Sequence, residues 1–301
     1  MNMFRKNTTK GLIAFLCSIV LYYLIGHTLL NLLSWKMRRY LNISADTIFN
    51  DWHQCMVTSD DTYLIGLTPN TFWKKIDKHI RTCEKYSMMS VLPIHSFENT
   101  DETKYAILPI DMNDKSTVLT IGIGQDVGSE LQYVKTLGSE NVEFHGSDPI
   151  ISGNMDLYSA FGHFYPYAIR NISAVSNASV YVNGVYIDRS VNHLEFSYFI
   201  NKLVKKQFFD NIFLDGEYAE YDLFEYFYKN GKLDSDGITI CQWNLEVHKP
   251  TYYQMLQFQE FIVRILKDRR YAILKSYQAH HIRLFFVNFD NEECVKKYIE
   301  V

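Results

Sequence analysis

A glycine-rich turn between two predicted strands is the feature that most limits what this chain can fold into. It runs Thr120-Ile121-Gly122-Ile123-Gly124-Gln125-Asp126-Val127-Gly128 after the β-like run 116–119, and Asp148 closes the next β-like run, 24 residues after Gly124. Gly122 and Gly124 let the backbone approach a ligand that any Cβ would push away. A carboxylate at the tip of the next strand can accept both hydroxyls of a ribose. The register therefore predicts a site for the adenosine end of a nucleotide-like cofactor, although such turns also form for packing reasons alone.

Strands alternate with helices in the pattern that begins at Ser116. Strands are predicted at 116–123, 142–146, 211–214 and 237–241, helices at 127–137 and 252–266, and two closing strands at 271–275 and 282–289. Asn183-Gly184 within 178–187 predicts a β-hairpin. Upstream, Thr71 is expected to cap a helix and 98–104 to form a loop. The pattern predicts an α/β fold with a mostly parallel, doubly wound sheet and a C-terminal antiparallel hairpin.

Composition narrows the class of protein. The chain has 301 residues, of which 47% are hydrophobic, so it can bury one good-sized core. The formal net charge is −4 and the body contains no basic tract. Nucleic acid is therefore excluded as the main partner.

The segment 11–35 is unlike a soluble protein. Its 25 residues contain no formally charged side chain, which is enough for a helix to cross a hydrocarbon core of about 30 Å. A buried core helix fits poorly because no polar face interrupts the run. A cleaved signal peptide is the stronger alternative, but the run exceeds the usual apolar length and lacks a prompt small-x-small pattern. We expect an uncleaved, single-pass anchor.

The orientation of that anchor does not follow from flanking charge, because three basic residues lie on each side. Glycosylation sequons begin at three positions on the C-terminal side: Asn42, Asn171 and Asn177. Four cysteines lie in the body: Cys55, Cys83, Cys241 and Cys294. They fit two disulfides with three possible connectivities, or else buried free thiols. Together these features favour a domain in the lumen of the Golgi or endoplasmic reticulum.

Polar groups follow two further predicted strands. Asp215-Gly216-Glu217-Tyr218-Ala219-Glu220 comes after 211–214, and Gln242, Asn244, Glu246 and His248 alternate in the next such segment. Acids and a histidine at neighbouring strand ends suit general-base chemistry on a hydroxyl or a hard cation. Alternatively, Asp215 caps a helix, Glu217 and Glu220 complement its dipole, and His248 is solvated. His280 and His281 are interpreted as surface residues of a hairpin turn, and we expect no metal.

These segments, in order, resemble the FkbM-type methyltransferases, above all a membrane-anchored branch abundant in nematodes. The resemblance covers about 85–290 and rests on the following motifs: 120–128, Gly146-Ser147-Asp148-Pro149, 157–162, 215–220 and 240–248. It implies a Rossmann-like class I methyltransferase that uses S-adenosylmethionine, most often for O-methylation. Gly122 and Gly124 would then face the amino-acid part of the cofactor, and Asp148 its ribose. Class I methyltransferases commonly have an acid at the position of Thr120, near the methionine ammonium group, and Asp126 is expected to compensate for its absence.

The resemblance and the residues together predict an anchored O-methyltransferase that acts on a small molecule, or on a hydroxyl of a glycan or lipid-like acceptor. Asp215, Glu217 and His248 are the predicted catalytic residues, and Asp215 or His248 would remove the hydroxyl proton. The predicted organisation is a cytosolic tail at 1–10, the anchor at 11–35, a stem and cap region at 36–84, and the methyltransferase domain at 85–301. The alternative is an inactive Rossmann-like binding or scaffolding protein in the same membrane.

Overall fold

The structure is a computed structural model, and it describes residues 43–58, 64, 66–182 and 184–300. The predicted anchor at 11–35 and the sequon at Asn42 lie outside these residues. One compact unit comprises Ala45–Val301. Within the described ranges, no helix combines the length and the apolar character needed to cross a membrane.

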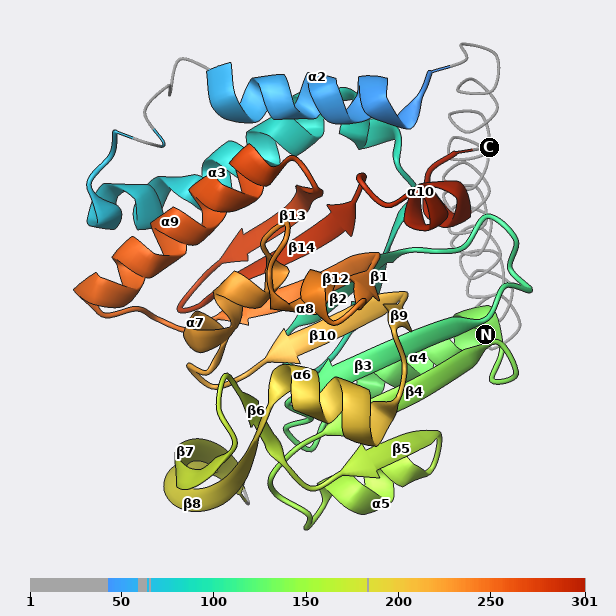
Figure 1. The fold of residues 1–301 in the computed structure, drawn as a ribbon, viewed down its shortest axis with the longest axis vertical. Helices are drawn as coiled ribbons and strands as arrows, with labels where there is room; N and C mark the ends of the chain where they lie inside the picture. The colour runs from blue at the N-terminus through green and yellow to red at the C-terminus, as the bar shows by residue number, and fades with distance from the viewer. Residues whose placement is uncertain (1–42, 59–63, 65, 183, 301) are drawn as a thin grey trace, which may run out of the picture. The chain divides into compact units, whose positions relative to one another are not determined.

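A mixed sheet of seven strands forms the centre of this unit (Figure 1). Across the sheet the strands are β13 (Tyr271–Gln278), β14 (Ile282–Asn288), β12 (Gln242–Val247), β10 (Asn211–Asp215), β3 (Ser116–Ile121), β4 (Val142–Ser147) and β5 (Gly162–Tyr165). The run from β12 to β5 is parallel, whereas β14 is antiparallel to both of its neighbours. The predicted doubly wound sheet with a C-terminal hairpin is confirmed. The direction of winding reverses between β3 and β10, where such sheets leave a crevice.

One predicted strand is displaced along the chain. The segment predicted at 237–241 contains only the short β11 (Thr239–Ile240), which pairs with β9 (Phe208–Phe209) outside the main sheet. In this region the strand that joins the main sheet is β12, whose alternating polar residues were interpreted as the end of a strand. The first strand of the C-terminal hairpin also runs to Gln278, three residues beyond the predicted Lys275.

Alternation along β12 directs its side chains to opposite faces of the sheet. Trp243 stacks between Phe227 at 3.9 Å and Phe286 at 4.0 Å, centroid to centroid. This face is covered by α7 (Glu220–Leu223), η3 (Phe224–Phe227) and α9 (Tyr252–Asp268). On the opposite face, the amides of Gln242 and Asn244 bond the backbone of another strand, so their polar groups are satisfied although buried.

That other strand belongs to a small hairpin formed by β1 (Ile94–Glu98) and β2 (Thr103–Ile107). Backbone N–H groups of Tyr105 and Ile107 donate to Asn244 Oδ1 and Gln242 Oε1, both at 2.7 Å. Beside the hairpin, α4 (Gly128–Leu137) covers an apolar core that includes Tyr133. The charged loop predicted at 98–104 is the turn of this hairpin, and its two ends are strand residues.

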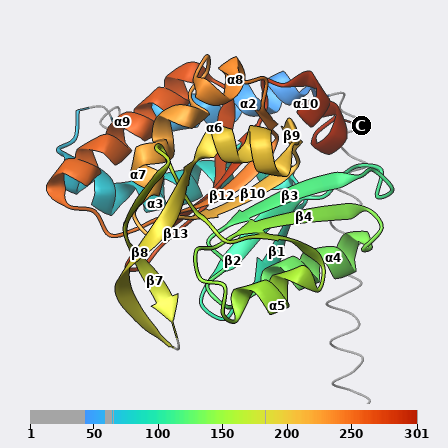
Figure 2. The same cartoon turned by 60° about the horizontal axis from the view of Figure 1, so that its bottom comes forward.

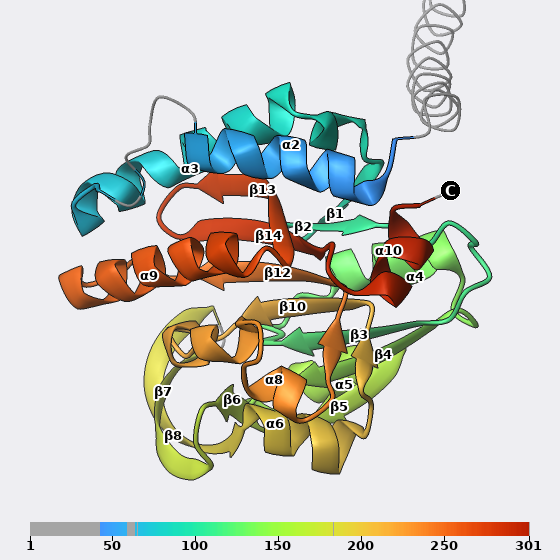
Figure 3. The ribbon, with the colours of Figure 1, turned by 45° about the horizontal axis from the view of Figure 1, so that its top comes forward.

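Two disulfides connect the four cysteines of the body: Cys55–Cys83 and Cys241–Cys294. The first joins α2 (Ala45–Thr58) to α3 (Pro69–Tyr86), and α3 packs on β13 (Figure 3). The second joins the residue before β12 to α10 (Glu292–Tyr298). Thr68, not the predicted Thr71, caps α3, because the hydroxyl of Thr68 accepts the N–H of Thr71.

A long hairpin extends beyond the sheet (Figure 2). It consists of β7 (Ala174–Val182) and β8 (Val185–Glu195), and β8 also pairs with β6 (Ala168–Arg170). The hairpin predicted at 178–187 is therefore confirmed and is longer than predicted. Nearby are α5 (Asn154–Ser159), α6 (Phe196–Tyr198) and the π-helix η2 (Phe199–Val204), and α8 (Lys232–Ser235) follows η3.

Candidate active site

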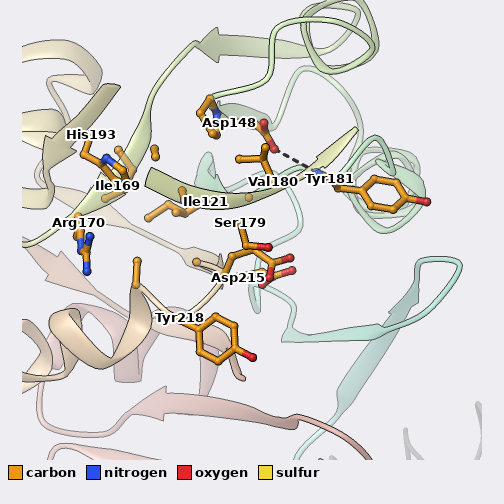
Figure 4. Close-up of a pocket in the computed structure, with 18 of the residues that line it drawn as sticks. Ile121, Asp148, Ile169, Arg170, Ser179, Val180, Tyr181, His193, Asp215 and Tyr218 are labelled. Carbon is orange, nitrogen blue, oxygen red and sulfur yellow. Dashed lines mark hydrogen bonds between the residues drawn. The ribbon is translucent and has the colours of Figure 1, made fainter. Parts of the chain in front are cut away.

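A cavity of about 450 Å³ lies at the carboxyl ends of the central strands (Figure 4). One wall is the glycine turn with Asp148, and another is the turn 215–219 that follows β10. The β7–β8 hairpin supplies a third wall, including Val180 and Tyr181. This volume is in the range of small-molecule sites.

Gly122 lies where the glycine turn contacts the turn 215–219. Its φ is +83°, and its N–H donates to the Ser147 carbonyl at 2.9 Å. A Cβ built on Gly122 would lie 2.0 Å from the carbonyl oxygen of Asp215. Only glycine fits here, because the required φ and the close approach both exclude a side chain.

Asp148 organises the glycine turn. Its Oδ2 accepts N–H groups from Ile123 at 3.0 Å and Gly124 at 3.2 Å, while Oδ1 accepts that of Ile150 at 2.8 Å. Burial raises the pKa of Asp148, although these backbone donors oppose the shift. A carboxylate has about four acceptor positions, so a ligand hydroxyl can still bind. Asp148 lines the cavity, as its predicted role requires.

Two other predicted cofactor contacts point elsewhere. Thr120 is fully buried, donates to Glu130 at 3.0 Å and accepts from Tyr158 at 3.0 Å. Asp126 accepts N–H groups of Thr100 at 2.7 Å and Gly128 at 2.9 Å, which ties the β1–β2 turn to α4. Neither side chain is among the residues that line the cavity. Their position in the motif placed them near the cofactor, but the direction of each side chain is set by tertiary contacts.

The predicted catalytic residues come together. His248 Nε2 lies 3.1 Å from Glu217 Oε2 and 3.6 Å from Asp215 Oδ1. On the other side of the ring, Nδ1 lies 3.1 Å from Glu220 Oε1, which also accepts the His248 N–H at 2.8 Å. Asp215 and Glu217 line the cavity, whereas His248 is buried behind them with 4% exposure.

The turn after β10, which positions Asp215 and Glu217, has an unfavourable backbone conformation. Glu217 and Tyr218 have φ values of 48° and 78°, a region that non-glycine residues rarely occupy. Capping does not explain Asp215, since the residue that precedes α7 is Ala219 and α7 has no side-chain cap. The proposed capping and solvent-facing alternatives for Asp215 and His248 are therefore wrong.

Charge sets the protonation of the cluster. Burial lowers the pKa of His248, but hydrogen bonds to Glu217 and Glu220 outweigh it and raise the pKa to about 12. In this arrangement the carboxylates favour the protonated ring, and the role of His248 as a base stays a prediction. Burial and the nearby Glu246 raise the pKa of Asp215 well above its ordinary value. That direction suits a base that must hold a proton near neutral pH.

Sequence reasoning missed the contact that His281 makes with the site, whereas it had named Glu246 and Glu220 among the polar groups at these strand ends. His281, interpreted as a surface residue, packs its ring 4.5 Å from that of His248 and accepts the N–H of Lys249 at 3.2 Å. Glu246 lies beside it and is held by Arg283 at 2.8 Å. The fully buried Glu220 accepts from His248, as described above. Two groups of three side chains have ligand atoms close enough to share a metal ion: Glu246, His248 and His281, and Asp215, Glu217 and His248.

Comparison with known proteins identifies the family. The methyltransferase FkbM domain matches residues 92–294, about two-thirds of the chain, so this chain belongs to that family. It is 23% identical over 258 residues to a Caenorhabditis elegans protein named uncharacterized protein C28H8.7, covering 84% of this chain and 81% of that one. Among solved structures, it is similar to one described as a putative rRNA-methylase from Clostridium thermocellum, with a TM-score of 0.32 and 10% identity over 60% of this chain and 92% of that one.

Proposed function

We propose that this chain is an S-adenosylmethionine-dependent O-methyltransferase whose acceptor is a hydroxyl of a glycan or lipid-like molecule. Membership of the methyltransferase FkbM domain family supports a methyltransferase. The observation that carries the proposal is the single cavity bounded by Gly122, Gly124 and Asp148 on one side and by Asp215 and Glu217 on the other. The cavity would therefore hold the cofactor against the glycine turn and the acceptor molecule beside the two acidic side chains.

The residues fit the cofactor. A Cβ on Gly124 would meet nothing within 4 Å, so this side of the turn is open. Asp148 retains acceptor capacity for a ribose hydroxyl, and the turn's backbone lies against the cavity. When bound, S-adenosylmethionine supplies an electrophilic methyl group on a sulfonium.

The chain's part in the reaction is to position and to accept a proton. Asp215 and Glu217 line the cavity and would orient the acceptor hydroxyl, and most of the rate gain would come from that alignment. Asp215 would accept the proton of the acceptor hydroxyl, whose oxygen would take the methyl group that bound S-adenosylmethionine supplies. Val185, Tyr186 and Ile187 on the hairpin are 58%, 59% and 42% exposed, which favours the lipid-like acceptor.

Cofactor binding tests the proposal. Isothermal titration calorimetry on the full chain in detergent, with S-adenosylmethionine and with S-adenosylhomocysteine, is expected to show one site for each. No detectable binding at millimolar concentration would defeat the enzyme and favour the inactive binding protein. That second candidate is supported by Thr120, since a buried hydroxyl replaces the acid that class I methyltransferases commonly have at this position.

We further propose that the segment 11–35 anchors the chain as a single-pass type II membrane protein, with the body in the lumen of the Golgi or endoplasmic reticulum. The two disulfides support an oxidising compartment. Asn171 is exposed in the turn between β6 and β7, whereas Asn177, although also exposed, lies within β7 opposite Ser190 of β8. Asn171→Gln is therefore expected to remove a glycosidase-sensitive shift that Asn177→Gln leaves largely in place. Full protease sensitivity of the body in sealed microsomes would contradict this topology.

A further inference from the structure

We propose that Asp215, Glu217 and His248 form a binding site for a divalent transition-metal cation of the Mn²⁺ type, facing the cavity. The proposal rests on the proposed function only for the role of the cation, because the ligand geometry stands independently of any cofactor. It replaces the sequence-based expectation that the site needs no metal.

The ligand atoms have the separation that a shared cation requires. Glu217 Oε2 and Asp215 Oδ1 lie 3.1 Å and 3.6 Å from His248 Nε2. Ligands about 2.1 Å from one metal ion are about 3.0–3.5 Å apart in octahedral or tetrahedral arrangements. Small movements of the side chains would therefore place one ion in contact with all three atoms.

The other ring nitrogen of His248 is already held as in a metal site. Metal-binding histidines usually donate their second N–H to a carboxylate, which fixes the ring and its tautomer. Here Glu220 Oε1 lies 3.1 Å from Nδ1, and the Glu220 side chain is fully buried. With Nδ1 occupied, Nε2 is left to face Asp215 and Glu217.

Two buried carboxylate oxygens of the cluster lack a hydrogen-bond partner among the described residues: Asp215 Oδ1 and Glu220 Oε2. Asp215 Oδ1 is itself directed at His248 Nε2. Unpartnered buried acceptors are costly and need an explanation such as an ion. A cation between Asp215 and His248 would satisfy the first of these oxygens.

The charge balance also favours a divalent ion. The three carboxylates Asp215, Glu217 and Glu220 pair with His248, and in the described part of the chain no lysine or arginine lies within ion-pair distance of them. Lys104 pairs with Glu102 and Glu130 instead, while Arg283 pairs with Glu246 and other acids. Three acidic side chains thus meet at a single imidazole, and a divalent ion there would stabilise their ionised forms.

The ligand set indicates which ions fit. Imidazole nitrogen suits transition metals, and carboxylates suit hard cations, so a mixed set favours Mn²⁺ or Zn²⁺ over Ca²⁺. Three protein ligands leave coordination positions open, and Asp215 and Glu217 line the cavity. An acceptor oxygen could occupy an open position and be oriented there.

Mn²⁺ itself is the probe. Electron paramagnetic resonance of free Mn²⁺, titrated with the full chain in detergent and without cofactor, is expected to show one bound ion per chain. Asp215→Asn and Glu217→Gln should each weaken binding at least tenfold, while the exposed controls Asp156→Asn and Glu140→Gln bind as the wild type. Zn²⁺ should displace Mn²⁺, and an equal concentration of Ca²⁺ should not.

Several outcomes would overturn the site: absence of bound Mn²⁺, wild-type affinity in both ligand variants, or displacement by Ca²⁺ as effective as by Zn²⁺. Circular dichroism identifies a variant that has not folded, and the remaining ligand variant then decides. Calorimetry with S-adenosylmethionine separates the two proposals. Mn²⁺ binding without cofactor binding would retain the cation site and remove the methyltransferase, and the reverse result would do the opposite.

Discussion

The carboxylates on the two sides of the cavity, Asp148 on one and Asp215 with Glu217 on the other, have different kinds of partner. Asp148 directs both oxygens to backbone N–H groups of the chain around it. Asp215 and Glu217 instead face a histidine, and one Asp215 oxygen has no hydrogen-bond partner in the described residues. The first side is thus a backbone turn that local sequence can build, and the second is a cluster of acidic side chains around a histidine, assembled from separate segments.

Two buried histidines show the same contrast. Burial lowers the pKa of His145 on β4 to about 4, although Glu143 at 3.1 Å opposes the shift. Hydrogen bonds with two carboxylates raise that of His248 to about 12 against the effect of burial. The environment of His145 therefore favours the neutral ring, whereas that of His248 favours the protonated ring.

The largest expected effect comes from Gly122, which joins the two sides. Gly122→Ala should lower the free energy of unfolding by about 3 kcal/mol or more, because the new Cβ collides with the Asp215 carbonyl as well as adopting an unfavourable φ. Gly124→Ala has an open environment at φ +61° and should lose only about 1–2 kcal/mol. Gly66→Ala, with nothing within 4 Å, should be neutral. Denaturant unfolding measures all three, and equal losses for Gly122 and Gly124 would contradict the collision.

The next effect is a loss of stability in acid. A histidine whose folded pKa lies below its unfolded value stabilises the protein above about pH 6.5, and that stability is lost as pH falls toward the folded value of about 4. His145 should therefore contribute a decline of about 2–3 kcal/mol across this window. The difference between the wild type and His145→Gln in denaturant unfolding isolates it from other groups that titrate. Parallel pH profiles for the two proteins would refute the assignment.

Asp148→Ala should weaken S-adenosylmethionine binding by about 1.5–3 kcal/mol, the range for a hydrogen bond to a charged group. The turn also loses its acceptor for Ile123 and Gly124, so part of this loss is loss of shape. Calorimetry gives the affinity, and the exposed Glu140→Gln serves as the control. Unchanged affinity in a folded variant would mean that Asp148 supports only the turn.

The smallest effect should come from Thr120→Val. Removing the hydroxyl deletes bonds to Glu130 and Tyr158 inside the core, which should cost about 1 kcal/mol of stability. Cofactor affinity should stay within twofold of the wild type, because the side chain does not line the cavity. A larger change in affinity would return Thr120 to the cofactor site.

Local signals predicted that Gly122, Gly124 and Asp148 lie together at the cavity, but not that Thr120 and Asp126 point away from it. The acidic cluster followed from the sequence only in outline. The glycine turn and Asp148 lie within one strand-turn-helix-strand unit, where spacing and φ requirements are visible in sequence. The polar alternation of β12 was visible too, but Gln242 and Asn244 bond β2 rather than a ligand. That contact spans more than a hundred residues, and spacing contains no signal for it. The part played by His281 depends on tertiary packing in the same way.

The disulfide pairing and the helix cap also depended on the folded structure, the first over a long sequence separation and the second over a short one. Four cysteines allowed three pairings, and only the packing of α2 on α3 and of α10 near β12 selects one. Thr68 and Thr71 are both reasonable caps by residue type, and the choice between them depends on which residue leaves the helical conformation. The sequence shows the chemistry of each residue and the periodicity of the apolar positions, whereas the partner of each side chain is determined by the folded structure.

The order of strands in the sheet has a consequence for biosynthesis. Among the described strands β14 comes last in sequence, yet it lies between β12 and β13. Until β14 is synthesised, β12 and β13 each have an unpaired edge. Cys241 also has no disulfide partner until Cys294, 53 residues later in the sequence, has been synthesised. The sheet is therefore completed only after β14 has been synthesised, and a nascent chain arrested before residue 282 exposes an unpaired strand edge to chaperones and to other copies of itself.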